Sequence, residues 1–143
     1  RSGAARAVAR SWARASPVEA AAWAGAGPSA EGMDRGHLLG EVVQQWVPKD
    51  PDATGRWLET LPQDLSRDVA VRYYAWKIED MDAGAAVQWA STIRQEQLRV
   101  TQQETAARAW LKQDEPAARA WIAGSNLSSE AKTRLLVSAA PPR

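Results

Sequence analysis

The sequence predicts an all-α protein, an α-solenoid of about four antiparallel helix-turn-helix hairpins plus a C-terminal capping helix. Alanine is abundant while Val and Ile are sparse, which favours helix over sheet. Eight tryptophans supply most of the aromatic side chains of the 143 residues, and phenylalanine is absent. Most of these tryptophans recur at a fixed spacing, and such internal periodicity is typical of stacked helical repeats.

Two series of anchor residues run along the chain with identical steps. The first-helix anchors stand at positions 12, 46, 78 and 110 and the second-helix anchors at 23, 57, 89 and 121, so both series advance by 34, 32 and 32 residues. Ile78 is the third first-helix anchor, because Trp76 would break the constant spacing of 11. The pattern divides a single domain, 1–143, into units of about 1–28, 29–62, 63–94 and 95–127, followed by a terminal helix at 128–140. Because the chain begins in repeat register and its last helix is unpaired, we expect a fragment of a longer protein.

A short oxygen-bearing side chain stands seven residues before each second-helix anchor. Such a residue caps a helix by accepting hydrogen bonds from free amides of the first turn. Proline follows directly at positions 17 and 51, where the first helical residue needs no amide donor. Small residues three and four positions before the anchor leave room for an indole, so we interpret the Trp pairs as hairpin core rather than as a stacking platform for bases or sugars. The predicted caps are Ser16, Asp50, Asp82 and Asp114.

An arginine stands 11 residues before every first-helix anchor, at positions 1, 35, 67 and 99. Two interpretations are open. The arginine either bonds the carbonyl end of the preceding second helix or a loop carboxylate, or the row binds a phosphate or carboxylate ligand. The first interpretation is favoured because the row points toward the core side. The four residues are Arg1, Arg35, Arg67 and Arg99.

The composition excludes several classes of function. Eighteen basic and seventeen acidic residues nearly cancel, which disfavours nucleic-acid binding, and no apolar run is long enough for membrane insertion. One histidine and no cysteine make a transition-metal site improbable, and no cofactor is predicted. Glu79, Asp80 and Asp82 are better interpreted as capping and solvated acids than as a cation site, and His37 as an exposed polar residue. With no catalytic constellation at a specific spacing, the protein is predicted not to be an enzyme.

The period and the two-helix unit resemble the helical-hairpin superfamily that includes tetratricopeptide and Sel1-like repeats. The Trp-Leu-Gly-Tyr pattern of tetratricopeptide repeats is absent, and the Asp-Pro corner differs from their turn. The stretch from Trp46 to Trp57 is most similar to tandem Trp-x3-Asp-Pro-x-Ala-Ala-x2-Trp repeats of uncharacterised bacterial proteins. The resemblance implies a scaffold or binding module and no particular activity.

One first helix departs from its counterparts. The back faces of the first helices are expected to be solvated, as with Arg6, Arg10, His37, Glu41, Gln44, Glu104 and Arg108. The third unit instead presents Val69, Arg72, Tyr73 and Trp76 there. Either a neighbouring unit packs on this face, or it is an exposed aromatic and arginine surface of the kind favoured at binding hot spots.

The leading hypothesis is therefore a non-enzymatic scaffold that binds a peptide or protein partner. The alternative is a structural module that self-associates without a separate ligand. The predicted partner-binding residues are Arg72, Tyr73 and Trp76, with Gln44 and Arg108 flanking them on adjacent units.

Overall fold

The structure, a computed structural model, describes residues 2–26 and 32–138. Within these ranges it contains nine α-helices and no strand, which confirms the predicted all-α class. The helices are α1 (Ser2–Ala15), α2 (Pro17–Ala26), α3 (Gly32–Trp46), α4 (Pro51–Glu59), α5 (Leu65–Ile78), α6 (Ala83–Ala90), α7 (Glu96–Gln113), α8 (Glu115–Gly124) and α9 (Ser129–Ser138).

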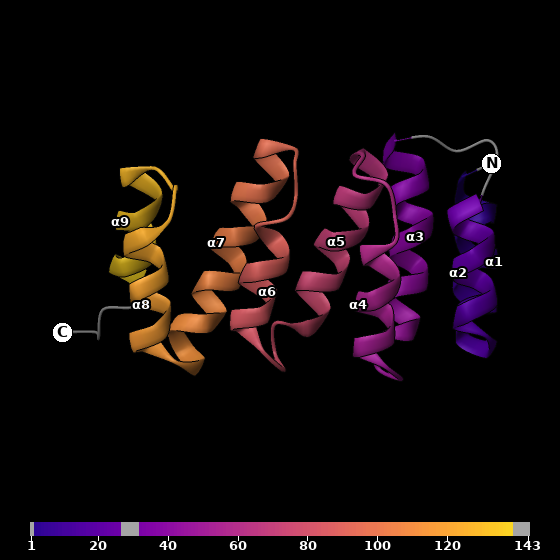
Figure 1. Cartoon of the computed structure of the whole chain (residues 1–143), viewed down its shortest axis with the longest axis horizontal. Coiled ribbons are helices and arrows are strands. Elements are labelled where there is room, and N and C mark those ends of the chain that lie inside the picture. The colour runs from indigo at the N-terminus through magenta and orange to yellow at the C-terminus, as the bar shows by residue number, and fades with distance from the viewer. Residues whose placement is uncertain (1, 27–31, 139–143) are drawn as a thin grey trace.

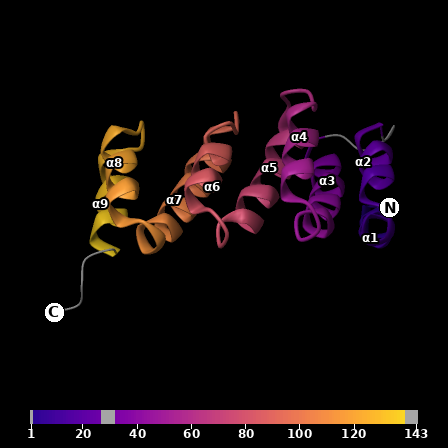
Figure 2. The ribbon, with the colours of Figure 1, turned by 60° about the horizontal axis from the view of Figure 1, so that its bottom comes forward.

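The helices stand side by side in a row, with α1 and α2 at one end and α8 and α9 at the other (Figure 1). Each odd-numbered helix packs on the next odd-numbered helix, and each even-numbered helix packs on the odd-numbered helices before and after it. The turned view in Figure 2 shows the same succession along the row. One cluster of buried apolar side chains runs through this arrangement from Ala9 in α1 to Leu135 in α9.

Aspartate begins three of the even-numbered helices, as the sequence predicts. The side chains of Asp50, Asp82 and Asp114 accept hydrogen bonds from the amides three residues later at 3.0, 3.0 and 3.3 Å. Their backbones are nearly superimposable, with φ of −160°, −158° and −153° and ψ of 84°, 89° and 83°. At the remaining corner, the first along the chain, α2 begins at Pro17, and the Ser16 carbonyl accepts a hydrogen bond from the Ala20 amide at 3.0 Å. The corners at Asp50, Asp82 and Asp114 are therefore built by side-chain capping, whereas the bond shown at the predicted cap Ser16 is that of its backbone carbonyl.

Small residues on the even-numbered helices make room for the anchors. The residue three positions before each second-helix anchor is fully buried in all four cases: Ala20, Thr54, Ala86 and Ala118.

Two pairs of anchors contact each other directly. The ring centroids of Trp12 and Trp23 are 5.7 Å apart, and those of Trp46 and Trp57 are 5.8 Å apart. Where Ile78 replaces tryptophan, Tyr74 packs edge-on against Trp89 at 4.9 Å instead. This supports the core interpretation of the Trp pairs, although most of the indoles are only half-buried.

The expectation that the back faces of the odd-numbered helices are solvated was wrong at the start of the row. Glu41 on α3 is only 6% exposed and pairs with Arg6 and Arg10 of α1 at 3.3 and 3.2 Å. His37 is half-buried and bonds Tyr73 through Nδ1 at 2.9 Å. The reason is that successive odd-numbered helices pack directly on one another, which covers the faces that an isolated hairpin would expose.

No helix in the described part of the chain is both long enough and apolar enough to cross a membrane.

Candidate functional site

The surface around Trp76 is built on α5, which is packed on more than one side. On one side, the side chain of Val69 lies so close to Gly36 of α3 that a Cβ at residue 36 would stand 2.5 Å from the Val69 Cβ. One turn further, a Cβ at residue 40 would stand 2.4 Å from Cδ2 of Tyr73. Two glycines spaced four residues apart on one helix thus let α5 approach α3 closely.

Tyr73 is therefore held by α3 rather than presented freely. Its hydroxyl bonds His37 at 2.9 Å and its ring meets the His37 ring edge-on at 6.0 Å. The guanidinium of Arg72 lies 5.5 Å from the centroid of the same ring, within cation–π range. These contacts hold Tyr73 and Arg72 in place beside the indole of Trp76.

Trp76 itself remains 54% exposed, and the ammonium of Lys77 lies 5.8 Å from its ring centroid. A shallow pocket of about 260 Å³ opens beside it, lined by Arg72, Tyr73 and Trp76 from α5 and by Gln102 from α7. Drug-sized ligand sites have volumes of roughly 300–1,000 Å³. The space next to Trp76 is thus suited to a single side chain and the main chain that carries it.

Gln102 is a polar residue that the sequence did not single out. It is only 6% exposed, and its Nε2 atom is buried without a hydrogen-bond acceptor among the described residues. Buried amides are nearly always paired, because an unpaired donor loses its hydration without compensation. An orphaned donor in the lining of a pocket is a feature of sites that a ligand completes.

One basic side chain, that of Arg72, lines this pocket, and Arg108 stands outside its lining. Among the described residues neither Arg72 nor Arg108 forms an ion pair with a carboxylate. Arg108 lies on α7 and acts electrostatically on Glu79, which follows Trp76 by three residues. Burial raises the pKa of the Glu79 carboxyl, Asp80 raises it further, and Arg108 opposes the shift.

The structure brings together three of the five residues that the sequence analysis selected: Arg72, Tyr73 and Trp76. Gln44, half-buried on α3, and Arg108, exposed on α7, do not line the pocket. Gln102 takes the place on the adjacent unit that was predicted for Arg108.

The described arginines of the row bond backbone carbonyls. Those bonded by Arg35 and Arg67 lie near the end of the preceding second helix, as the favoured interpretation predicts, whereas those bonded by Arg99 lie in the loop after α6. Arg35 Nη1 lies 3.5 Å from the carbonyl of Gly25, near the end of α2. Arg67 Nε donates to the carbonyl of Leu58 in the last turn of α4 at 3.4 Å. Arg99 Nη1 donates to the carbonyls of Ile93 and Arg94 at 3.2 and 3.0 Å. The remaining member of the row, Arg1, lies outside the described residues.

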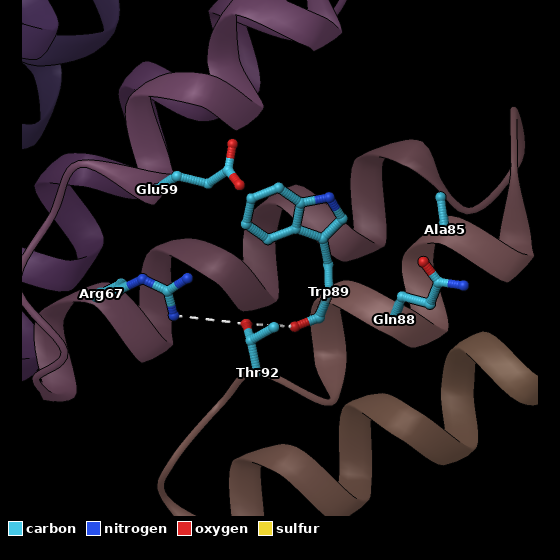
Figure 3. A pocket seen from close by; sticks show the side chains of 6 residues that line it. All are labelled: Glu59, Arg67, Ala85, Gln88, Trp89 and Thr92. Carbon is cyan, nitrogen blue, oxygen red and sulfur yellow. Dashed lines mark hydrogen bonds between the residues drawn. The ribbon is translucent and has the colours of Figure 1, made fainter.

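Arg67 also stands in the wall of a cleft of about 290 Å³ (Figure 3). Its Nη1 donates to Thr92 Oγ1 at 3.4 Å, and the indole of Trp89 and the carboxylate of Glu59 lie across from it (Figure 3). Burial lowers the pKa of the Arg67 guanidinium, while Asp68 first, then Glu59 and Asp64, oppose that shift. These acids balance the charge of Arg67, so the cleft does not offer an uncompensated cation.

The same cleft recurs 32 residues later. A second one of about 440 Å³ is lined by Ser91, Arg99, Trp121 and Gly124, which correspond in register to Glu59, Arg67, Trp89 and Thr92. The recurrence marks the clefts as seams between successive units. The sequence carried a signal for them, because these four lining positions follow the period of the anchors.

The buried carboxylate of Asp68 joins α5 to the loop before α7. It is 2% exposed, and its two carboxylate oxygens each accept from a backbone amide, Arg94 N and Gln95 N, at 3.0 Å. These amides lie just before α7, so a side chain of α5 fixes the start of the next helix pair.

Asp82 and His37, which the sequence analysis considered, both have structural contacts. Asp82 serves as a helix cap, and the described residues contain no group of three or more His, Asp or Glu side chains arranged to hold a metal ion. His37 is committed to Tyr73. The surface around Trp76 therefore combines an exposed indole, an orphaned amide and basic groups, an arrangement suited to recognition.

Comparison with protein-family models, with curated proteins and with solved structures gives no match to this chain.

Proposed function

We propose that the chain is a non-enzymatic helical-repeat scaffold that binds a peptide or protein partner through the surface around Trp76. The proposal includes an α-solenoid of four helical hairpins with α9 as its cap. The two series of anchors and the packing of each even-numbered helix between two odd-numbered ones support this arrangement. A row of stacked hairpins offers an extended surface, which is how helical-repeat proteins commonly bind other chains.

A single observation carries the proposal: Trp76 exposes 54% of its surface on a helix that is otherwise well packed. Nine residues of α5 are buried, and its neighbours Tyr73 and Arg72 are held in place by ring contacts. An exposed tryptophan beside arginine and tyrosine has the composition that dominates binding energy at interfaces. The contacts of Tyr73 and Arg72 reduce the conformational entropy that these two side chains would lose on binding.

We expect Trp76→Ala to weaken partner binding by more than tenfold, because truncated hot-spot residues typically cost about 2 kcal/mol or more. The free energy of unfolding is expected to change by less than about 1 kcal/mol, since the indole is more than half exposed. Quantitative affinity capture with wild type and variant, together with urea unfolding, measures both quantities.

Val18→Ala is the matched control, because Val18 on α2 is an apolar residue that is 66% exposed and far along the row. It should leave partner recovery unchanged. A large loss of stability in Trp76→Ala, or equal recovery by wild type and Trp76→Ala, would contradict the proposal.

A second candidate function is self-association through α1. Val8 and Trp12 are 52% and 36% exposed, whereas the residues at the same register of the next unit, Val42 and Trp46, are 0% and 7% exposed. The face of α1 that carries Val8 and Trp12 is thus exposed, whereas the corresponding face of α3 is covered. Contiguous exposed apolar residues of this kind mark interaction surfaces.

If this face mediates self-association, the weight-average mass in sedimentation equilibrium rises with protein concentration. Val8→Asp is then expected to return the chain to a monomer, because dimer formation would bury an unpaired charge. A mass equal to that of the monomer at all concentrations would exclude this candidate.

A further inference from the structure

We infer that the pocket beside Trp76 recognises an acidic peptide segment, with Gln102 donating a hydrogen bond to a main-chain carbonyl of that segment. The inference rests on the proposed function and names the chemistry of its ligand. In this arrangement an apolar side chain of the peptide lies against the Trp76 indole, and a carboxylate beside it pairs with Arg72.

The orphaned amide is the first argument. Gln102 is 94% buried, lines the pocket with Arg72, Tyr73 and Trp76, and leaves its Nε2 without an acceptor among the described residues. A leucine of similar volume would fill the same space without an unpaired donor. The glutamine therefore weakens the folded state unless an acceptor oxygen is supplied from outside, and a peptide main chain carries such an oxygen at every residue.

The charges are the second argument. Arg72 and Lys77 on α5 and Arg108 on α7 are basic, and among the described residues none of them forms an ion pair with a carboxylate. Glu79, directly after α5, has a carboxyl whose pKa is raised by burial and by Asp80, and Asp68 on α5 is buried with both oxygens bonded to backbone amides. A ligand carboxylate would provide Arg72 with the counter-charge that it lacks, in a planar geometry that guanidinium groups favour.

The shape is the third argument. The pocket is shallow and about 260 Å³ in volume, and Trp76 forms one exposed wall of it. An apolar side chain can cover the indole while the adjoining main chain lies over Gln102, whose side chain turns toward the pocket to donate because its Nε2 is buried in the unbound protein. The Trp76 indole and the Gln102 amide come from different helices, α5 and α7, so the ligand bridges two helices of the row.

The test uses the full chain and three short fluorescein-labelled peptides. The first carries Asp-Leu-Asp at its centre, the second replaces both aspartates by lysine, and the third replaces leucine by alanine. Fluorescence anisotropy measures affinity, and the indole N–H signal of Trp76, assigned with Trp76→Phe, reports where the peptide binds. We expect the acidic apolar peptide to bind at least about tenfold tighter than the lysine peptide and to shift the Trp76 signal.

Gln102→Leu separates recognition from folding. We expect this variant to bind the acidic peptide at least about fivefold more weakly than wild type does. The melting temperature of the variant should equal or exceed that of wild type, because an unpaired buried donor is removed. Gln102→Met is a second variant of similar volume in case leucine packs poorly. Gln88→Leu, an exposed glutamine on α6, is the matched control and should change neither quantity.

The inference is overturned if Gln102→Leu binds the acidic peptide as well as wild type, if the lysine peptide binds equally well, or if no peptide shifts the Trp76 signal. The proposed function fails separately, when wild type and Trp76→Ala recover the same partners in affinity capture. Partner recovery that depends on Trp76, without any preference for the acidic peptide, would keep the scaffold and reject this ligand.

Discussion

Replacing Arg67 by alanine is expected to lower the free energy of unfolding by about 2–4 kcal/mol, as removal of a buried charged hydrogen-bonding group does. The side chain is 4% exposed and donates to Leu58 O, Gln63 Oε1 and Thr92 Oγ1, each at 3.4 Å. It thereby joins the end of α4 to the segment that follows α6. Without it the Leu58 carbonyl loses this donor, and the acids around it lose their balancing charge.

Urea unfolding followed by circular dichroism measures this loss. Arg56→Ala on α4 is the matched control, because Arg56 is exposed and should shift the free energy of unfolding by less than about 0.5 kcal/mol. Arg67→Lys keeps the charge but lacks the several N–H donors of a guanidinium. Its free energy of unfolding should therefore lie between those of wild type and Arg67→Ala. Equal losses for Arg56→Ala and Arg67→Ala would show that the seam does not depend on the buried guanidinium.

Gly40→Ala is expected to destabilise the protein by about 2 kcal/mol, as overpacking of a tight helix contact does. The new Cβ would stand 2.4 Å from Cδ2 and 2.5 Å from Cε2 of Tyr73, a separation that forces the ring to move. Moving the ring would also disturb the 2.9 Å hydrogen bond to His37. The higher helix propensity of alanine, worth up to about 1 kcal/mol, opposes this cost and is already included in the net figure.

Thermal and urea unfolding of a double-mutant cycle provide the test. In a Tyr73→Ala background the Gly40→Ala change should cost nothing, since the colliding ring is gone. Gly3→Ala is the control, because a Cβ there meets nothing within 4 Å and should be neutral or slightly stabilising. If Gly40→Ala costs the same with and without the Tyr73 ring, the close approach of α3 and α5 is not its cause.

The parts of the fold that could be predicted from the sequence depend on local signals. Asp50, Asp82 and Asp114 cap their helices because a side-chain oxygen and three following amides suffice for the interaction. The fully buried Ala20, Thr54, Ala86 and Ala118 follow from the period alone. Arg67 could be interpreted as a structural residue because its recurrence implied one repeated task.

The parts that could not be predicted depend on contacts between units. Glu41 is buried and Tyr73 is bonded to His37 because successive odd-numbered helices approach closely. A prediction that treats each hairpin by itself cannot include this contact between units. Gly36 and Gly40, four residues apart on one helix, carried a signal for this approach. Gln102 carried none, because an uncharged polar residue becomes noteworthy only when its neighbours leave its amide without an acceptor.

The two hydrogen bonds of Asp68 have a consequence for how the chain can be divided. The anchors place a unit boundary in the loop that follows α6, yet the amides of Arg94 and Gln95 in that loop are the partners of a carboxylate buried on α5. A cut at this loop would remove the two amides from which the Asp68 carboxylate accepts its hydrogen bonds. The boundary given by the sequence period therefore falls before the residues that complete the hydrogen bonds of α5. A shortened version of this protein is better ended beyond the first turn of α7.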